Sequence, residues 1–176
     1  TNNKSEIINA KGGIALYRCL IANRGEIAVR IIRACRELGI ETVAIYAKGD
    51  ESSLHVSLAD QAVCVGEANA LDSYLNQDRI ISAAEMTGAN AIHPGYGFLS
   101  ESPSFAHKVE ENDIYFIGPT KETMQMMGDK ITARQTVDQA GVPIIPGSTD
   151  AVESVDEVKE IAKEIGYPLV LKAASG

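Results

Sequence analysis

The sequence predicts an α/β fold, a Rossmann-like parallel sheet with helices on both faces. The first observation behind this prediction is that short apolar runs alternate with amphipathic stretches from Leu16 to about Gly118. The second is that five such strand and helix units follow one another at the spacing of crossover connections. Strands joined in this way run parallel and are covered by helices on both sides.

The first unit consists of a strand at residues 16–23 (LYRCLIAN) and a helix at residues 25–39. The apolar side chains of the helix share one face, formed by Ile27, Ile31, Ile32, Cys35 and Leu38. Its charged side chains share another face, formed by Arg30, Arg33 and Glu37. Gly39 is expected to end the helix, because glycine adopts the left-handed conformation of helix C-termini at low cost.

The later units repeat this pattern. Further strands are expected at the apolar runs 41–46, 61–66, 90–93 and 114–118. Helices are expected at the amphipathic stretches 54–60, 76–88 and 103–112. Ser102 and Pro103 predict the start of the last of these helices, because serine caps helix N-termini and proline is favoured in the first turn.

The alternation breaks after Pro119, where helical stretches at 122–127 and 130–140 come in succession. Extended chain is expected next, then a helix at 154–166 and a strand at 168–172. The apolar face of that helix is formed by Val155, Val158, Ile161, Ala162 and Ile165. Since one helix and two strands cannot close a core of their own, this second domain is predicted to be incomplete.

These patterns divide the chain into four parts. We expect residues 1–13 to be a flexible lead-in or a remnant of cloning, and residues 14–118 to be the Rossmann-like domain. Residues 119–141 are expected to form a helical linker, and residues 142–176 the beginning of the second domain.

Composition excludes several classes of partner. The net charge is −8, and the 16 basic residues are scattered, which argues against binding to nucleic acid or to an anionic membrane. No apolar run approaches the roughly 20 residues of a membrane span. Cys19, Cys35 and Cys64 lie far apart in apolar runs, which is typical of reduced, buried thiols in a cytoplasmic protein. The histidines show no zinc-site spacing, so no metal site is predicted.

Two glycine-containing turns follow strands. IANRGEIAVR stands where a dinucleotide-binding fold carries G-x-G-x-x-G, but only Gly25 is present, so we expect Asn23 to cap the helix and Gly25 to allow tight packing. IHPGYGFLSES has two glycines flanking Tyr96, which fits either a ligand-facing loop or a structural turn. Ser100 and Ser102 lie outside the G-x-S-x-G motif of serine hydrolases.

Two lysines occupy positions that suit a phosphate. Lys130 follows Gly128 and Asp129 at a helix start, where a positive charge is unfavourable unless an anion lies nearby. Lys172 ends the apolar strand PLVLK and precedes AASG, the expected entry to a flexible loop whose backbone amides could cover phosphates. The alternatives are a solvated side chain for Lys130 and a snorkelling edge residue for Lys172.

These motifs, in this order and spacing, closely resemble the N-terminal part of the biotin carboxylases, above all the bacterial subunit of acetyl-CoA carboxylase in fatty acid synthesis. The matching stretches run from about Leu16 to Gly176: LIANRGEIAVRIIRACRELGIETVAIY, AIHPGYGFLSES, FIGP, MGDK, AGVPIIPGS and GYPLVLKAASG. The resemblance implies a Rossmann-like domain, a helical linker and the start of an ATP-grasp lid domain. The chain would then be an N-terminal fragment, inactive alone and without catalytic residues of its own.

The resemblance also implies ligands and partners. In this family ATP activates bicarbonate, and the carboxyl group passes to biotin on a carrier protein. It implies that Lys130 and Lys172 bind ATP, and that Tyr96, Gly97 and Glu101 lie in the loop facing biotin and bicarbonate. Magnesium ligands would lie beyond the chain. The partners implied are the biotin carboxyl carrier protein, carboxyltransferase subunits and a second copy, which Arg30, Arg33 and Glu37 would contact.

Three alternatives stay open. The same segment occurs in carboxylases for pyruvate or an acyl-CoA, which resemble this chain in the same motifs. A nicotinamide-dependent oxidoreductase would share the Rossmann-like fold, although the third glycine and a clearly placed acidic residue for the ribose are missing. A stand-alone interaction module without chemistry is the third alternative.

Overall fold

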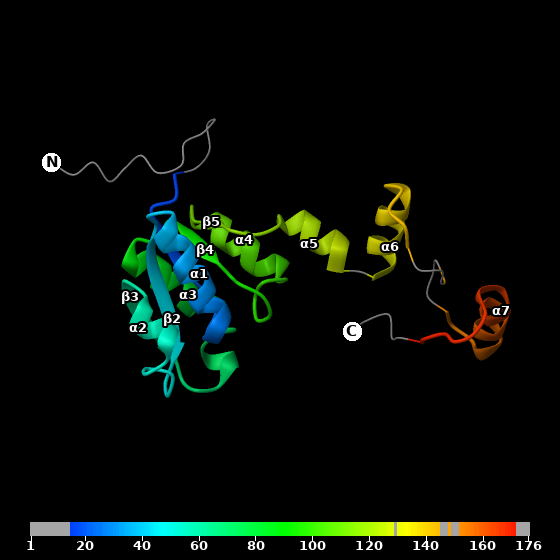
Figure 1. The fold of residues 1–176 in the computed structure, drawn as a ribbon, viewed down its shortest axis with the longest axis horizontal. Coiled ribbons are helices and arrows are strands. Elements are labelled where there is room, and N and C mark those ends of the chain that lie inside the picture. Colours follow the sequence, from blue (N-terminus) through cyan, green and yellow to red (C-terminus); the bar gives the residue numbers. More distant parts are fainter. Residues whose placement is uncertain (1–14, 129, 145–147, 149–151, 172–176) are drawn as a thin grey trace. The chain divides into compact units, whose positions relative to one another are not determined.

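The computed structural model describes residues 15–128, 130–144, 148 and 152–171 (Figure 1). The contacts between residues divide the chain into two compact units, Thr1–Lys121 and Glu122–Gly176.

The first unit is built on a parallel sheet, as predicted. Its strands are β1 (Arg18–Ile21), β2 (Glu41–Ala47), β3 (Gln61–Gly66), β4 (Ala91–His93) and β5 (Tyr115–Phe116). Their order across the sheet is β3-β2-β1-β4-β5, and every neighbouring pair is parallel. Strands β2 and β3 therefore follow on one side of β1, and β4 and β5 follow on its other side. The boundary between β1 and β4 is the switch point at which open α/β sheets bind ligands.

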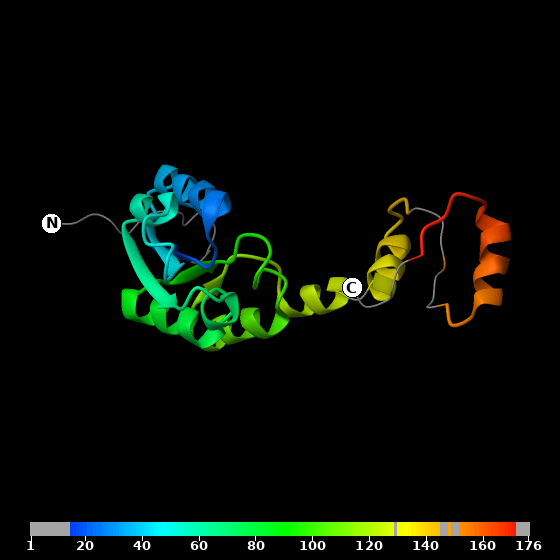
Figure 2. The ribbon, with the colours of Figure 1, turned by 90° about the horizontal axis from the view of Figure 1, so that it is seen from below.

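Helices cover both faces of this sheet. They are α1 (Gly25–Glu37), α2 (Leu54–Leu58), α3 (Gln77–Thr87) and α4 (Pro103–Glu111). Helix α1 contacts α2, β1 and β2, whereas α3 contacts β2 and β3 and α4 contacts β5. Figure 2 shows α1 and α2 on one side of the sheet and α3 and α4 on the other. The predicted three-layer α/β architecture is thus confirmed.

The core lies between the sheet and these helices. In β1, Cys19, Leu20 and Ile21 are fully buried, and the α1 side chains that cover this part of the core include Ala28, Ile31, Ile32 and Cys35. Leu38 was expected on the same face but is 51% exposed, because α1 ends at Glu37 and Leu38 is already the C-terminal cap residue. The predicted start of α4 is confirmed, with Ser102 Oγ accepting from Phe105 N at 3.3 Å, and Gly88 ends α3 in the left-handed conformation.

One prediction about the cysteines is wrong. All three thiols are free, and Cys19 and Cys35 are buried, but Cys64 is exposed. The reason is the strand order, which places β3 at the edge of the sheet, where only Val65 of its residues is buried.

The second unit consists of helices among its described residues. Helix α5 (Lys121–Gly128) begins at the boundary between the units, and α6 (Lys130–Gln139) and α7 (Val155–Ile165) follow. Ser154 caps α7 by accepting a hydrogen bond from Glu157 N. Of the predicted inward face of α7, only Ala162 is buried, and Val155 is 71% exposed.

The strand predicted at residues 168–172 does not form in its described part, residues 168–171. Val170 and Leu171 are 79% and 69% exposed. A strand needs a neighbour to satisfy its backbone hydrogen bonds, and the described residues of the second unit contain no other strand with which it could pair.

Candidate functional site

Two loops meet at the carboxyl ends of β1 and β4. Ile21 of β1 is in register with His93 of β4, and one residue later the amide of Ala22 donates to the His93 carbonyl at 2.9 Å. The β1–α1 turn and the HPGYG loop after β4 therefore leave the sheet side by side. This is the switch point of the fold, so the sheet topology itself selects these loops as the candidate site.

Asn23 joins the two loops. Its Nδ2 donates to the carbonyl oxygens of Pro94 at 2.7 Å and Tyr96 at 2.8 Å, and its Oδ1 accepts from the Arg24 amide at 2.8 Å. The predicted role of Asn23 as a helix cap is wrong, because the cap residue of α1 is Arg24 and no side chain caps this helix end. The Asn23 side chain instead donates hydrogen bonds to a segment 71 to 73 residues away in the sequence.

The glycines of the two turns serve different purposes. Gly25 has a φ of +63°, but an added Cβ would meet no atom within 4 Å, so it is required for its backbone conformation and not, as predicted, for close packing. Gly95 has a φ of +66°, and its Cβ would lie 2.8 Å from Asn23 Nδ2. Gly97, with a φ of +67°, faces open space.

The predicted loop residues Tyr96, Gly97 and Glu101 are all exposed on the segment between β4 and α4. The Tyr96 hydroxyl donates to the Glu26 carboxylate at the start of α1, and this hydrogen bond raises the pKa of Tyr96. On the sheet side of the loop, the Gly95 amide donates to His93 Nδ1 at 3.0 Å. Burial lowers the pKa of His93, which favours the neutral ring that can accept this bond.

An aromatic pair supports the loop from the side. The rings of Phe98 and Tyr74 stack with centroids 5.3 Å apart, and the Arg24 guanidinium lies 5.9 Å from the Phe98 centroid and 5.5 Å from that of Tyr74. The Tyr74 hydroxyl donates to Asp50 Oδ2 at 2.6 Å and accepts from the Ala47 amide at 3.0 Å. Burial, followed by the bond to Asp50, raises the pKa of Tyr74.

Sequence reasoning missed Tyr74 and Asp50. Both lie in irregular segments between strands and helices, where no periodicity indicates which side chains turn inward. The only signal for Tyr74 in the sequence was its place as a single tyrosine within EANALDSYLNQD. A buried tyrosine hydroxyl needs hydrogen-bond partners, but the sequence does not show that Tyr74 is buried.

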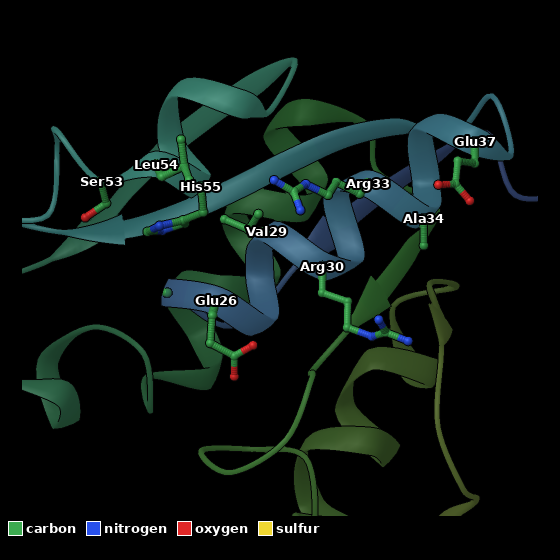
Figure 3. Close-up of a pocket in the computed structure, with 10 residues that line it drawn as sticks. Glu26, Val29, Arg30, Arg33, Ala34, Glu37, Ser53, Leu54 and His55 are labelled. Atoms are coloured by element: carbon green, nitrogen blue, oxygen red, sulfur yellow. The ribbon is translucent and has the colours of Figure 1, made fainter.

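The charged face of α1 borders a groove of about 850 Å³. Figure 3 shows Arg30, Arg33 and Glu37 projecting from α1, with Ser53, Leu54 and His55 on the neighbouring α2 segment. His55 is 1% exposed and its Nε2 lies 3.1 Å from the Ile45 carbonyl. The three predicted interface residues are thus on one exposed surface of the first unit.

The side chains of the two predicted ATP-binding lysines are not among those that the structure describes. Lys130 begins α6, but its side chain lies outside the described residues, as does Lys172 altogether. Among the residues that are described, no group of three or more His, Cys, Asp or Glu side chains is placed to hold a metal ion. None of the helices in that part of the chain has the length and apolar character needed to cross a membrane.

Two family models match the chain in succession. Residues 15–124 match the biotin carboxylase N-terminal domain, and residues 129–176 match the ATP-binding domain of the carbamoyl-phosphate synthase L chain. The boundary between the two matches lies close to the boundary between the two compact units at Lys121.

Individual relatives agree with these matches. The chain is 56% identical over 161 residues to biotin carboxylase 1 of Bacillus subtilis, which covers 92% of this chain and 36% of that protein. It is 52% identical to the mitochondrial propionyl-CoA carboxylase alpha chain of Rattus norvegicus, covering 90% of this chain and 22% of the relative.

Solved structures show the same likeness. The biotin carboxylase domain of Hydrogenobacter thermophilus 2-oxoglutarate carboxylase superimposes with a TM-score of 0.83 at 52% identity, covering 92% of this chain and 35% of the solved one. The chain thus spans about a third of the length of the biotin carboxylases that it matches. The resemblance inferred from the motifs is confirmed: the chain belongs to the biotin carboxylase family and contains its N-terminal domain.

Proposed function

We propose that this chain supplies the N-terminal domain and the opening of the ATP-binding domain of an enzyme that carboxylates biotin on a carrier protein with ATP and bicarbonate. The observation that carries the proposal is the succession of the two family matches, a biotin carboxylase domain followed by an ATP-binding domain. A solved relative with 52% identity was crystallised with MgADP, ADP and bicarbonate, which supports the same ligands here.

The HPGYG loop is the part of this chain that we assign to biotin and bicarbonate. It lies at the switch point of the sheet, and Tyr96 is 61% exposed there. Gly97 has no neighbour where a Cβ would stand, so a ligand could approach its backbone closely. Glu101 extends the loop toward α4 and provides an exposed carboxylate.

We assign ATP binding to Lys130 and Lys172, in the segment matched by the ATP-binding domain. When bound, ATP supplies the phosphoryl group that activates bicarbonate, and lysine ammonium groups offset phosphate charge. The described residues offer no cluster of three or more His, Cys, Asp or Glu side chains for magnesium, so we propose that its ligands lie outside this chain.

The compound that finally receives the carboxyl group distinguishes the members of this family. We propose the biotin carboxylase step of acetyl-CoA carboxylase, in the cytoplasm, with a carrier protein and carboxyltransferase subunits as partners. Relatives with similar identity include carboxylases of propionyl-CoA, 2-oxoglutarate and pyruvate, so the same segment of such an enzyme is the alternative. Assays of the reconstituted complex with each acceptor separate these cases.

We also propose that the groove on α1 contacts a second copy. Arg30, Arg33 and Glu37 carry both signs of charge on one exposed helix face, a pattern that can complement itself across a two-fold axis. Sedimentation of the full protein that carries this chain should show a dimer, weakened in Arg30→Glu.

The activity itself is tested by ATP hydrolysis in the full protein that carries this chain. We expect hydrolysis to depend on bicarbonate and to rise with free biotin. Hydrolysis that ignores both compounds would contradict the proposal.

A further inference from the structure

The β1–α1 turn, residues 23–26, has no function assigned by the proposal above. In dinucleotide-binding folds this turn lies against a pyrophosphate, which the single glycine here does not favour. In this structure Asn23 and Glu26 contact the HPGYG loop (residues 93–97) instead, and the Arg24 guanidinium lies near the ring of Phe98, the residue that follows the loop. The turn therefore contacts a segment of the protein at the place where a dinucleotide-binding fold contacts a phosphate.

Asn23 makes the central contact. Its side-chain amide donates to the carbonyl oxygens on both sides of Gly95, at 2.7 Å to Pro94 and 2.8 Å to Tyr96. The residue is 3% exposed, so water cannot readily replace these bonds. A Cβ on Gly95 would lie 2.8 Å from Nδ2, which means that the loop can approach Asn23 this closely only because residue 95 is glycine.

The hydrogen-bond pattern requires an amide. Two acceptors face Nδ2, and one donor, the Arg24 amide at 2.8 Å, faces Oδ1. An aspartate keeps the shape and the acceptor for Arg24 but presents an oxygen to two carbonyl oxygens. The two N–H donors of the Asn23 side-chain amide thus satisfy the two carbonyl oxygens that face it.

Two residues that follow Asn23, Arg24 and Glu26, contact side chains of the same segment between β4 and α4. Glu26 accepts the hydroxyl of Tyr96, and the Arg24 guanidinium lies 5.9 Å from the ring of Phe98. These contacts fix the loop at its exposed side chains, whereas Asn23 fixes its backbone between Pro94 and Tyr96.

We infer that Asn23 is a positioning residue, which sets the backbone of Tyr96 and Gly97 for binding of biotin and bicarbonate. The inference rests on the proposed function. It adds that biotin kinetics depend on a side chain buried behind the loop. ATP binding, assigned to the other unit, should not depend on it.

The test is Asn23→Asp in the full protein that carries this chain. We expect kcat/KM for free biotin to fall by about 10- to 100-fold, the scale of losing buried hydrogen bonds, while the KM for ATP changes less than about twofold. The matched control is Asn76→Asp, which adds the same charge at the cap of α3. There aspartate can accept the Arg79 amide as asparagine does, so biotin kinetics should not change.

Further measurements separate the outcomes. Amide NMR shifts of residues 95–98 should move in Asn23→Asp and not in Asn76→Asp. If Asn23→Asp fails to fold, Gly95→Ala disturbs the same contact from the loop side and should show the same selective loss. Unchanged biotin kinetics in a folded variant, or an equal loss for ATP and biotin, would overturn the inference. If the wild type lacks biotin-dependent activity, the proposed function fails, and unmoved loop amides in Asn23→Asp would overturn the positioning role separately.

Discussion

Replacing Tyr74 with phenylalanine tests the network behind the HPGYG loop. The change removes only the hydroxyl oxygen, so the stack on Phe98 and the contact with Arg24 should remain. Tyr74 is 2% exposed and Ala47 is 1% exposed, so loss of the hydroxyl leaves the Ala47 amide buried without its partner. Asp50 loses a hydrogen bond of 2.6 Å as well.

The expected cost follows from these two bonds. An unsatisfied buried amide costs about 1–3 kcal/mol, and a lost bond to a carboxylate that water can reach costs about 1 kcal/mol. We therefore expect Tyr74→Phe to lower the free energy of unfolding by about 2–4 kcal/mol. Urea denaturation at pH 7 measures this difference. Tyr115→Phe is the control, because Tyr115 is 45% exposed and its change should stay within about 0.5 kcal/mol.

The raised pKa of Tyr74 adds a pH signature. The folded protein keeps the phenol neutral where the unfolded chain begins to ionise, so the stabilisation is complete below about pH 10 and is lost as the pH rises further. Above about pH 10, the wild type should lose about 1.4 kcal/mol per pH unit relative to Tyr74→Phe. A Tyr74→Phe protein as stable as the Tyr115→Phe control, with no such convergence, would refute this account of the network.

Three further predictions concern other parts of the chain. Thr42 donates to Asp60 and lowers its pKa, so the stabilisation present above about pH 4 should fade as the pH falls further, and Asp60→Asn should remove this acid dependence in urea titrations. Iodoacetamide should label exposed Cys64 well before Cys19, which is fully buried, as peptide mass spectrometry can measure; equal labelling would contradict the core described here. In the full protein, Lys172→Gln should raise the KM for ATP by about one to two orders of magnitude, and an unchanged KM would remove Lys172 from the ATP site.

The elements of the first unit could be predicted because each is periodic within its own residues. The apolar face of α1 is an example, since Ile31, Ile32 and Cys35 are buried as their spacing predicts. The prediction failed at the end of the element, where Leu38 keeps the period but lies beyond the last helical residue. Cys64 failed for a different reason, because its exposure depends on the order of strands across the sheet.

The candidate site was predicted in part. The HPGYG loop could be found because its two glycines lie two residues apart in the sequence, on either side of Tyr96. The partner of that loop could not, since Asn23 is separated from Pro94 by 71 residues and its sequence neighbours favour a helix cap. Residues 168–171 have a strand-like pattern of side chains but form no strand. A strand needs a neighbouring strand, and the described residues of the second unit provide none.

Carboxylation of biotin by the full protein that carries this chain tests the central claim most directly. Purified protein is incubated with ATP, radiolabelled bicarbonate and free biotin, and the label retained by biotin is counted before and after acidification. We predict label in biotin that requires ATP and is released by acid. Absence of labelled biotin, together with saturable binding of NADH followed by its fluorescence, would contradict the assignment and favour an oxidoreductase.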